Sequence, residues 1–379
     1  MRRRVTMWLR LRIYSLMKAK TAIACSLGLV LTLACSTTGV SVRQTYEARW
    51  RKGVLAHGVN PTTVVYPFEA TPQMLEWARK IDPPAASDLL RLARLQRALF
   101  DTGEFKFVYD GNITATATDA FETRHGNCLS FTSLFIALTR GLGMRTSLVT
   151  VQRKVEVSRE EDLVIISRHV VAGYSLAGKL YLYDFYVASD EPYIQRRVLD
   201  DVTASALYHT NIGSVALKQG DVQGALSNLE LATRLAPDVA AVWVNLGVAR
   251  RRLGDLKGAA QAYEKALRAE PGDPSALTNL AYLYRLQGRE AEAKAALQAA
   301  SRGASSPYTL IALAGVEEVQ GHLKDARRHL LRARRGYRHI PEVWDALARF
   351  ASRRGDADRA ARYRKKAERL REKAAASNS

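Results

Sequence analysis

Cysteine is scarce in this chain of 379 residues, which contains only Cys25, Cys35 and Cys128. So few cysteines exclude a cysteine-based zinc site, and no pair of histidines has the spacing of metal ligands. A phosphate-binding loop is also absent, because Gly141-Leu142-Gly143 is too short to form one. The sequence therefore implies no metal and no cofactor.

The chain also lacks a hydrophobic run long enough to cross a membrane as a helix, which takes about 20 apolar residues. Its apolar run from Thr21 to Leu33 follows a basic stretch without acids and has the length of a secretory signal core. The run ends in LTLACS, which resembles the lipobox of bacterial lipoproteins. This resemblance implies that residues 1–34 are a signal peptide and that Cys35 becomes the lipidated N-terminus.

Other residues of the leader bear on this interpretation. Cys25 lies too close to the basic residues to be the lipid site. Met17 is an alternative start, because MKAK and the apolar run already form a complete leader. Lipid on Cys35 would anchor the protein to a membrane, and an uncleaved N-terminal anchor is the alternative. Ser36 resembles an outer-membrane address, so we expect an exported protein at the outer membrane, facing the periplasm.

Cys128 is then the only free thiol of the mature chain. Exported proteins meet oxidants, so an unpaired thiol is a liability unless it is buried or used. This raises the expectation that Cys128 is catalytic. The alternative is a buried structural thiol in an apolar helix.

Acidic residues are outnumbered, with 37 Asp and Glu against 57 Lys and Arg, and the formal net charge is +20. Most of the excess outside the leader lies near the C-terminus, where residues 324–373 alone carry +11. Such a field favours an anionic partner: an acidic protein, a phosphorylated glycolipid or a membrane surface. The alternative is a solvated face in an arginine-rich proteome. Nucleic acid is not expected as a partner of an exported lipoprotein.

Two folded regions are expected after a tether and lead-in helix over residues 35–84, where Thr71 caps a helix that begins with Pro72. The first region, residues 85–202, has helical patterns after Ser87, over about 117–124, and from Cys128 to Gly141. Strand-like runs follow (TSLVTVQ, LVIIS, HVVAGY and LYLYDFY), with a charged loop expected over 153–162. This predicts an α+β domain.

The second region repeats with a period of 33 or 34 residues. Glycine and two alanines recur in register, at Gly220, Gly254, Gly288, Gly321 and Gly355, at Ala225, Ala259, Ala293, Ala326 and Ala360, and at Ala232, Ala266, Ala300, Ala333 and Ala367. Alanine lets two helices approach and glycine turns the chain between them, so the pattern resembles tetratricopeptide (TPR) repeats in an all-α solenoid. Five repeats are expected, over 206–239, 240–273, 274–306, 307–340 and 341–374, followed by a disordered tail at 375–379.

Three short motifs of the first region resemble the transglutaminase-like superfamily. They are Gly126-Asn127-Cys128 before the apolar helix, His169-Val170, and Asp184-Phe185. The resemblance implies a papain-like Cys-His-Asp domain, in which Cys128 attacks an amide carbonyl, His169 is the base and Asp184 orients it.

Local chemistry supports these roles independently. Cys128 opens a predicted helix, whose dipole and free N–H groups favour a thiolate and could hold an oxyanion, with Asn127 and the Cys128 amide as candidate donors. A hairpin centred between residues 176 and 177 would place His169 opposite Asp184, about 5 Å apart at Cβ. A bulge at Gly178 would shift this register by one residue.

Each of these residues has an alternative interpretation or a rival. His169 could be an ordinary strand residue. His125 is a rival base that more plainly shapes the turn before Cys128, and Asp190 competes with Asp184 from an exposed turn. Arg124 and Arg140 are expected to be solvated or salt-bridged.

Asn211, Asn245 and Asn279 recur every 34 residues and are candidates to bind the backbone of a protein or peptide in the TPR groove. The alternative is a structural preference for asparagine, and repeats four and five lack it. The sequence predicts a lipid-anchored thiol enzyme that acts on amide bonds as a peptidase, amidase or crosslinking acyltransferase, with the repeats recruiting substrate. The other hypothesis is a non-catalytic adaptor.

Overall fold

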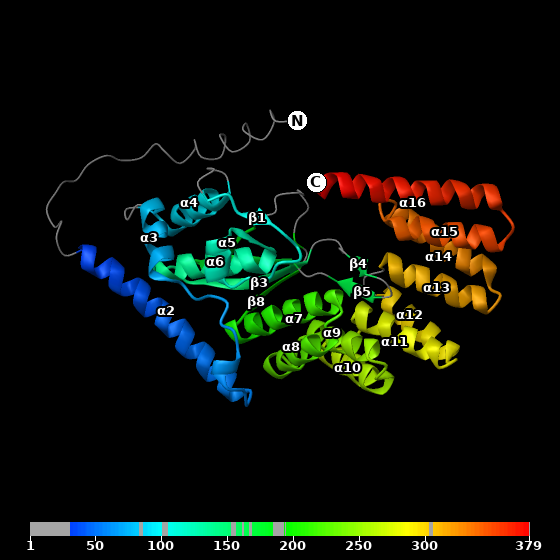
Figure 1. Cartoon of the computed structure of the whole chain (residues 1–379), viewed down its shortest axis with the longest axis horizontal. Helices are drawn as coiled ribbons and strands as arrows, with labels where there is room; N and C mark the ends of the chain where they lie inside the picture. Colours follow the sequence, from blue (N-terminus) through cyan, green and yellow to red (C-terminus); the bar gives the residue numbers. More distant parts are fainter. Residues whose placement is uncertain are drawn as a thin grey trace.

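The computed structural model describes residues 31–82, 86–100, 105–152, 157–160, 163–166, 169–184, 193, 195–302 and 306–378. Residues 1–30 of the expected signal peptide, and Asp190, lie outside this part of the chain. In the part that is described, no helix combines the length and the apolar character that crossing a membrane requires. The chain forms an α+β region followed by a curved array of helix pairs (Figure 1).

The lead-in segment contains two α-helices, where the sequence predicted one. The expected helix is α3 (Pro72–Ile81), with Thr71 as its N-cap and Pro72 in its first turn. The additional helix is α2 (Leu31–Ala56), and a short 3-10 helix, η2 (Pro61–Thr63), follows it.

Helix α2 is tied to the rest of the fold by its C-terminal half. Trp50 and Val54 are buried against Val202 and Val242, and the Trp50 indole donates a hydrogen bond to Ser205 Oγ (3.0 Å). These large side chains lie four residues apart on one helix face. The segment expected to be a tether is therefore, from about residue 42 onward, part of the packed structure.

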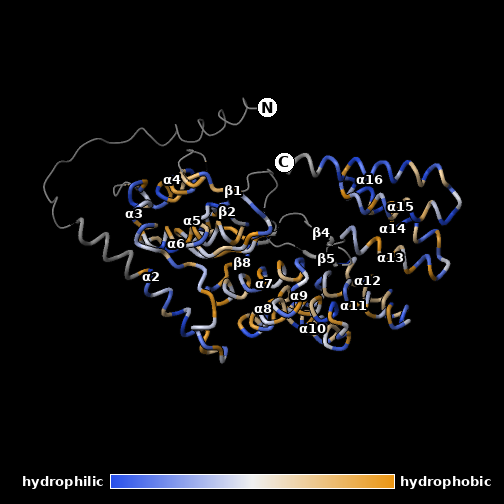
Figure 2. The backbone as a smooth tube through the Cα atoms, viewed as in Figure 1, coloured by the Kyte–Doolittle hydropathy of each residue, from blue (hydrophilic) through white to orange (hydrophobic). Residues whose placement is uncertain are grey.

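The α+β region has a four-stranded antiparallel sheet with α6 packed against it. The strand order is β7-β6-β3-β8, with β3 at Thr146–Gln152, β6 at His169–Leu176, β7 at Lys179–Tyr183 and β8 at Gln195–Leu199. The remaining helices are α4 (Asp88–Phe100), α5 (Ala117–Thr123) and α6 (Cys128–Gly141). Residues 129–141 of α6 are buried, and Figure 2 shows this helix as largely hydrophobic.

Two small pairs of strands complete the region. Strands β1 (Val108–Tyr109) and β2 (His125–Gly126) pair in parallel just before α6. Strands β4 (Val157–Glu160) and β5 (Leu163–Ile166) form an antiparallel hairpin between β3 and β6. The sequence predicted a charged loop over 153–162, so β4 is a correction: its residues acquire strand structure by pairing with the apolar β5.

Ten helices in five antiparallel pairs make up the array within residues 201–302 and 306–378. They are α7 (Asp201–Gln219), α8 (Val222–Leu235), α9 (Ala240–Arg252), α10 (Leu256–Ala269), α11 (Pro274–Leu286), α12 (Glu290–Arg302), α13 (Pro307–Val319), α14 (Leu323–Gly336), α15 (Pro341–Arg353) and α16 (Ala357–Asn378). Helix α7 begins before the expected boundary at 206, and α16 extends to Asn378 through most of the expected tail.

The repeating residues have the packing roles expected of them. The five turn glycines all have positive φ, between 72° and 83°, a conformation that side chains with a Cβ disfavour. The ten repeating alanines are all fully buried, with 0% exposure. The repeat period therefore records helix contact and turn geometry, and it correctly predicted the array.

A buried ion pair joins the α+β region to the first repeat. Arg140, in the last turn of α6, donates through both terminal nitrogens to Asp201, in the first turn of α7 (2.7 and 2.9 Å). The Arg140 side chain is 2% exposed, and its guanidinium lies 3.6 Å from the centroid of the Tyr46 ring on α2. Three segments distant in sequence thus meet at one arginine, which is salt-bridged as expected.

Candidate active site and repeat groove

Cys128 is the first residue of α6, and Asn127 caps the helix. The Asn127 carboxamide oxygen accepts hydrogen bonds from the backbone N–H groups of Leu129 (3.0 Å) and Ser130 (3.1 Å). Cys128 is a free, half-buried thiol. Its own N–H has no acceptor within the helix, as is general for the first turn. A backbone donor without an intrahelical acceptor and a positive helix end thus lie beside the sulfur.

Asn127 is held at the helix end by hydrogen bonds of its backbone and its side chain. Its backbone N–H donates to the Ile113 carbonyl (2.8 Å), and its side-chain amide donates to Thr114 Oγ1 (2.7 Å). The side chain is only 5% exposed. The Cys128 N–H and the Asn127 amide stay the predicted oxyanion donors, and the amide already gives one of its two N–H bonds to Thr114.

His169 and Asp184 lie together beside the N-terminus of α6. His169 Nε2 is 2.7 Å from Asp184 Oδ1, and both side chains are largely buried. A hydrogen bond between the imidazole and the Cys128 thiol adds to this pair. The threonine hydroxyl of Thr132 donates to the Val170 carbonyl (3.3 Å), which fastens α6 to β6 next to the cluster. The three residues singled out from the sequence are therefore neighbours in space.

The expected hairpin register is wrong by two residues. Gly173 pairs with Leu182 and Leu176 with Lys179, so the turn is centred between Ala177 and Gly178. Both turn residues have positive φ, at 48° and 76°. A two-residue turn of this kind fits the twist of the flanking strands. A shift of two residues keeps each side chain on its face of the sheet, so Asp184 still reaches His169 diagonally.

The electrostatics of the cluster favour a charged imidazole. Burial lowers the pKa of His169, but the hydrogen bonds to Asp184 and Cys128 and the charge of Asp184 outweigh burial and raise it to about 9. His169 is therefore protonated at neutral pH. An imidazolium next to a sulfur is the arrangement that stabilises a thiolate nucleophile.

Two residues that the sequence did not single out hold Asp184. The Tyr193 hydroxyl donates to Asp184 Oδ2, the oxygen that His169 leaves free. The side-chain amide of Gln96, on α4, donates to the Asp184 backbone carbonyl. Gln96 interrupts an otherwise apolar helix face, which is a weak sign in the sequence of a polar contact. Tyr193 gives no such sign, because its contact with Asp184 is not local.

The rival base is placed elsewhere. His125 is exposed, and its Nδ1 lies 2.6 Å from the Thr123 carbonyl, within the turn that leads into β2. Arg124 ends α5 with positive φ, and its guanidinium lies 5.4 Å from the centroid of the Phe105 ring. Across the described ranges, no group of three or more His, Cys, Asp or Glu residues is placed to hold a metal ion.

The three repeat asparagines do not form a uniform ladder. The Asn245 amide donates to the Ala241 carbonyl of its own helix (3.0 Å), and Asn211 is half-buried on α7. Asn279 is 3% exposed, and its side-chain nitrogen is a buried donor without a partner in the described structure. Asn279 lines a groove with a volume of about 390 Å³ between the first helices of the last three repeats.

Fold and site together define a two-part protein: an α+β domain with a Cys-His-Asp cluster at a helix N-terminus, and a solenoid of helix pairs. Residues 75–173 match the transglutaminase-like superfamily. Residues 210–274 and 250–308 match tetratricopeptide repeats. The chain is thus a transglutaminase-like domain followed by TPR repeats, as the sequence motifs predicted. The comparison with curated proteins found no match to the sequence of this chain.

Solved structures resemble part of the chain. MamA 41-end from Desulfovibrio magneticus RS-1 is 20% identical, with 44% of this chain and 96% of that chain covered and a TM-score of 0.36. Pseudomonas aeruginosa pilF is 21% identical, with coverages of 44% and 76% and a TM-score of 0.39. PilW, described as a type IV pilus biogenesis factor, is 20% identical, with coverages of 44% and 78% and a TM-score of 0.40.

Proposed function

We propose that the protein is a thiol enzyme that cleaves or transfers amide bonds. The observation that carries this proposal is the cluster at the start of α6, where Cys128 faces a protonated His169 that Asp184 holds at 2.7 Å. Nucleophile, acid–base group and orienting carboxylate are the components that covalent acyl transfer requires.

The first half of the reaction forms an acyl-enzyme. The Cys128 sulfur adds to the substrate carbonyl carbon, and the electron pair of the C=O bond moves to oxygen, where the Cys128 N–H can donate to it. The intermediate collapses as the C–N bond breaks, and the His169 imidazolium gives its proton to the leaving amine. The products are a thioester on Cys128, a free amine and a neutral imidazole.

In the second half, water or an amine adds to the thioester carbonyl while His169 takes its proton. The C–S bond then breaks, and the sulfur leaves as the thiolate beside the restored imidazolium. Water gives a carboxylic acid and an amine gives a new amide, so the same residues serve a hydrolase or a crosslinker. Asp184 keeps the ring oriented and stabilises its charge throughout.

A thiol-directed activity probe tests the proposal on the full-length protein. Labelling should occur at Cys128 and should be lost in Cys128→Ser. In His169→Ala it should fall at least about 100-fold in rate, the range of a general acid–base contribution. Unchanged labelling in His169→Ala, with the fold intact by circular dichroism, would show that the thiol is merely exposed and would favour an adaptor.

We also propose that the TPR repeats recruit the protein or peptide substrate. The repeats are protein-interaction elements by their fold, and the buried, unpartnered side-chain nitrogen of Asn279, a residue that lines the groove, supports a bound partner. The experiment is affinity capture from the exported proteins with a Cys128→Ala bait. This variant cannot form the acyl-enzyme, so bound substrate is not converted and lost. An equal set of bound proteins after removal of the last two repeats would contradict recruitment.

Export and lipidation are the third part of the proposal. Cys35 follows the basic and apolar leader, and in the described structure it lies in the first turns of α2. A lipid on Cys35 would anchor the packed domain to the outer membrane through this helix, facing the periplasm. Mass spectrometry of the mature N-terminus should find a diacyl or triacyl group on Cys35, and an unmodified N-terminus upstream would contradict it.

A further inference from the structure

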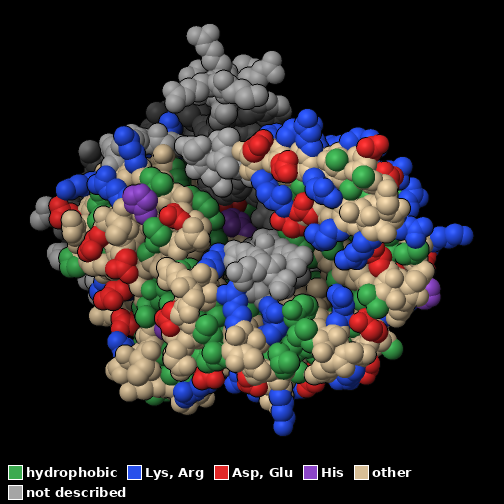
Figure 3. Space-filling model, turned by 45° about the vertical axis from the view of Figure 1, so that its right-hand side comes forward, with side chains coloured by type: hydrophobic (Ala, Val, Ile, Leu, Met, Phe, Trp, Pro, Cys, Tyr) green, Lys and Arg blue, Asp and Glu red, His purple; other side chains and the backbone are tan. Residues whose placement is uncertain are grey.

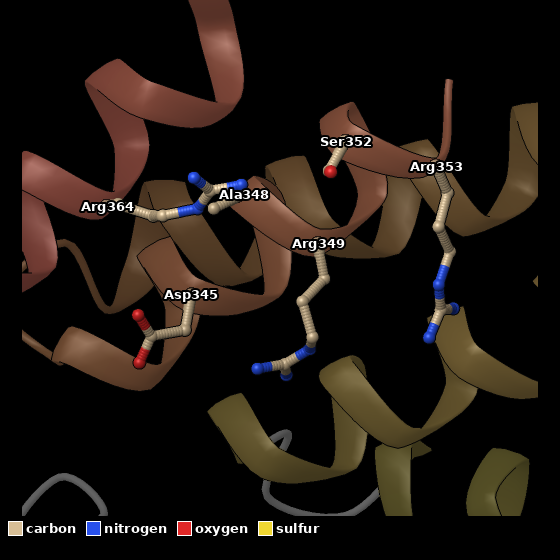
Figure 4. A pocket seen from close by; sticks show the side chains of 6 residues that line it. All are labelled: Asp345, Ala348, Arg349, Ser352, Arg353 and Arg364. Atoms are coloured by element: carbon tan, nitrogen blue, oxygen red, sulfur yellow. The ribbon is translucent and has the colours of Figure 1, made fainter. Parts of the chain in front are cut away.

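The groove on the concave side of the array continues into a second, basic pocket. The groove is bordered by the first helices of the last three repeats, α11, α13 and α15. Arg349 and Arg353, on α15, also line a pocket of about 330 Å³ that extends to Arg364 on α16 (Figure 4). The two hollows thus form one continuous surface, called here the arginine groove.

Positive charge in the arginine groove is in excess of its acidic partners. Glu318 is already paired with Arg353 (3.2 Å), and Asp345 with Arg371. Arg349 and Arg364 pair with no carboxylate in the part of the chain that the structure describes. Both side chains are exposed, and Figure 4 shows their guanidinium groups at the pocket. Two guanidinium groups are therefore free to bind anions.

The floor of the groove holds a second, independent sign of a ligand. Asn279 lines the groove, and its side-chain nitrogen is buried and has no partner among the described residues. A buried N–H donor without an acceptor destabilises the fold unless something binds to it. A carbonyl or carboxylate oxygen of a bound chain is such an acceptor.

We propose that the arginine groove binds an acidic segment of a protein. Carboxylates of the segment bind Arg349 and Arg364, and a carbonyl oxygen accepts from Asn279. Guanidinium groups suit carboxylates because they donate two parallel hydrogen bonds. An extended chain can enter a concave groove, whereas a flat membrane surface reaches only its rim. The proposal names the partner class for the recruitment proposed above, but binding itself needs no catalysis.

One wall of the groove, helix α11, contacts a strand of the α+β region. Strand β5 contacts α11, which carries Asn279, and β6 begins at His169 shortly after β5 ends at Ile166. Figure 3 shows the molecule hollowed between its two halves, with Lys and Arg side chains gathered over the C-terminal repeats. An acidic segment in the groove would therefore hold the rest of its chain on the side of the β4–β5 hairpin and Cys128.

The test measures fluorescence anisotropy with the full-length Cys128→Ala protein. The probes are a labelled peptide of alternating Glu and Ala and a matched peptide with Gln in place of Glu. The acidic peptide should bind more tightly, and added salt should weaken it. The double change Arg349→Ser with Arg364→Ser should weaken it about tenfold or more, because two charge-assisted contacts are lost.

A matched control keeps the charge change but moves it out of the groove. Arg327 and Arg335 are exposed residues of α14 that do not line the groove. The double change Arg327→Ser with Arg335→Ser should alter acidic-peptide binding less than about twofold, because screening weakens distant exposed charges. If both double variants lose the same affinity for the acidic peptide, the proposal is overturned, and the overall positive charge of the repeats explains the binding.

Two further measurements separate the remaining outcomes. Asn279→Asp in the same protein should weaken binding of the acidic peptide. It should also weaken binding of the Gln peptide, because both peptides lose the donor of Asn279. Equal binding of both peptides by the starting protein would overturn the proposal. Preferential binding to phosphatidylglycerol vesicles would also overturn the proposal if it is lost only in Arg349→Ser with Arg364→Ser. That result would identify a membrane surface as the partner instead. A failure of catalysis leaves all these binding outcomes unchanged, so the two proposals fail separately.

Discussion

At the scale of single residues, the carboxylate of Asp184 is the point on which the site depends. One oxygen is bound to the His169 imidazole and the other accepts from Tyr193, so each carboxylate oxygen has a hydrogen-bond partner that fixes its position. Such a carboxylate both orients the ring and sets its charge. The consequences can be separated by pH and by substitution.

The pH dependence of acylation should follow His169. With its pKa raised to about 9, the imidazolium supplies the leaving-group proton below that pH, so the rate on an amide should fall as the pH rises through about 9. Asp184→Asn should move this fall to lower pH and reduce kcat about 100-fold, since the hydrogen bond and the charge that raise the pKa are both weakened. A pH profile that is the same in wild type and Asp184→Asn would contradict the assignment.

The same shift links stability to pH. The pKa of His169 in the folded protein lies above its unfolded value of about 6.5, so its contribution to stability is fully present below the unfolded pKa. It is lost as the pH rises through about 9, when the folded imidazole releases its proton. Urea unfolding of the wild type should therefore show a loss of stability across this window that is smaller in His169→Gln. Parallel curves for the two proteins would rule out the linkage.

Tyr193 should act as a positioning residue. Tyr193→Phe removes the donor to Asp184 Oδ2 and leaves the ring in place, so kcat should fall about tenfold, the effect of one hydrogen bond to a charged group. The melting temperature should change little. Steady-state kinetics on a small amide, compared with Gln96→Ala as a second variant, measures this; an unchanged kcat would mean that His169 alone orients the carboxylate.

At the scale of elements, helix ends carry the site and the joint between the two regions. The first turn of α6 presents Cys128, and its last turn presents Arg140, which is bound to the first turn of α7 through Asp201. One buried helix thus positions the nucleophile and fixes the array. Its two ends can be tested separately.

The cap of α6 should contribute to stability. Asn127→Ala removes the acceptor for two backbone N–H groups, so the free energy of unfolding should fall by about 1–2 kcal/mol. Asn127→Asp keeps the acceptor and is the matched control. Urea unfolding measures both. If Asn127→Asp destabilises the fold as much as Asn127→Ala, the side-chain donor to Thr114 is the more important contact.

The Arg140–Asp201 pair should behave as a buried ion pair. Arg140→Met leaves the Asp201 carboxylate buried without its partner, so it should cost about 3–5 kcal/mol of unfolding free energy. The double change Arg140→Met with Asp201→Leu removes both charges and should recover much of this loss. A double variant as unstable as the sum of the single variants would mean that the pair contributes through packing around Tyr46 and not through charge.

The parts of this fold that follow a local rule could be predicted from the sequence. The repeat period placed the turn glycines and packed alanines, and the polar cap before an apolar run placed Cys128 at a helix start. The hairpin register was missed because a non-glycine residue, Ala177, takes a positive φ in the turn. Tyr193 and the packing of Trp50 were missed because they depend on contacts between distant segments, which leave no periodic pattern.

At the scale of the whole molecule, the array is too closely joined to the catalytic region to be removed entirely. Ala204, on α7, belongs to the hydrophobic core of the α+β region, and Leu207 and Tyr208 pack against it. Deletion from Ala206 onward would strip this surface and confuse misfolding with loss of recruitment. The last two repeats make a better cut, since their core around Leu310, Leu330 and Leu347 is separate.

Removal of residues 307–379 should therefore separate recruitment from chemistry. If the repeats bring the protein substrate to Cys128, KM for that substrate should rise sharply, while kcat/KM for a small reactive ester stays nearly unchanged, because remote contacts supply affinity and not transition-state chemistry. The cut exposes Leu297 on α12, so retained cooperative unfolding in urea must accompany the kinetics.

The double change Asn245→Ala with Asn279→Ala is the gentler comparison, since both side chains are replaced without removing a helix. Added salt then distinguishes the two modes of binding: contacts to the arginines weaken steeply with screening, whereas amide contacts respond little. If both variants process the protein substrate like the wild type at every ionic strength, the repeats serve another partner, and the concave surface does not deliver substrate to the thiol.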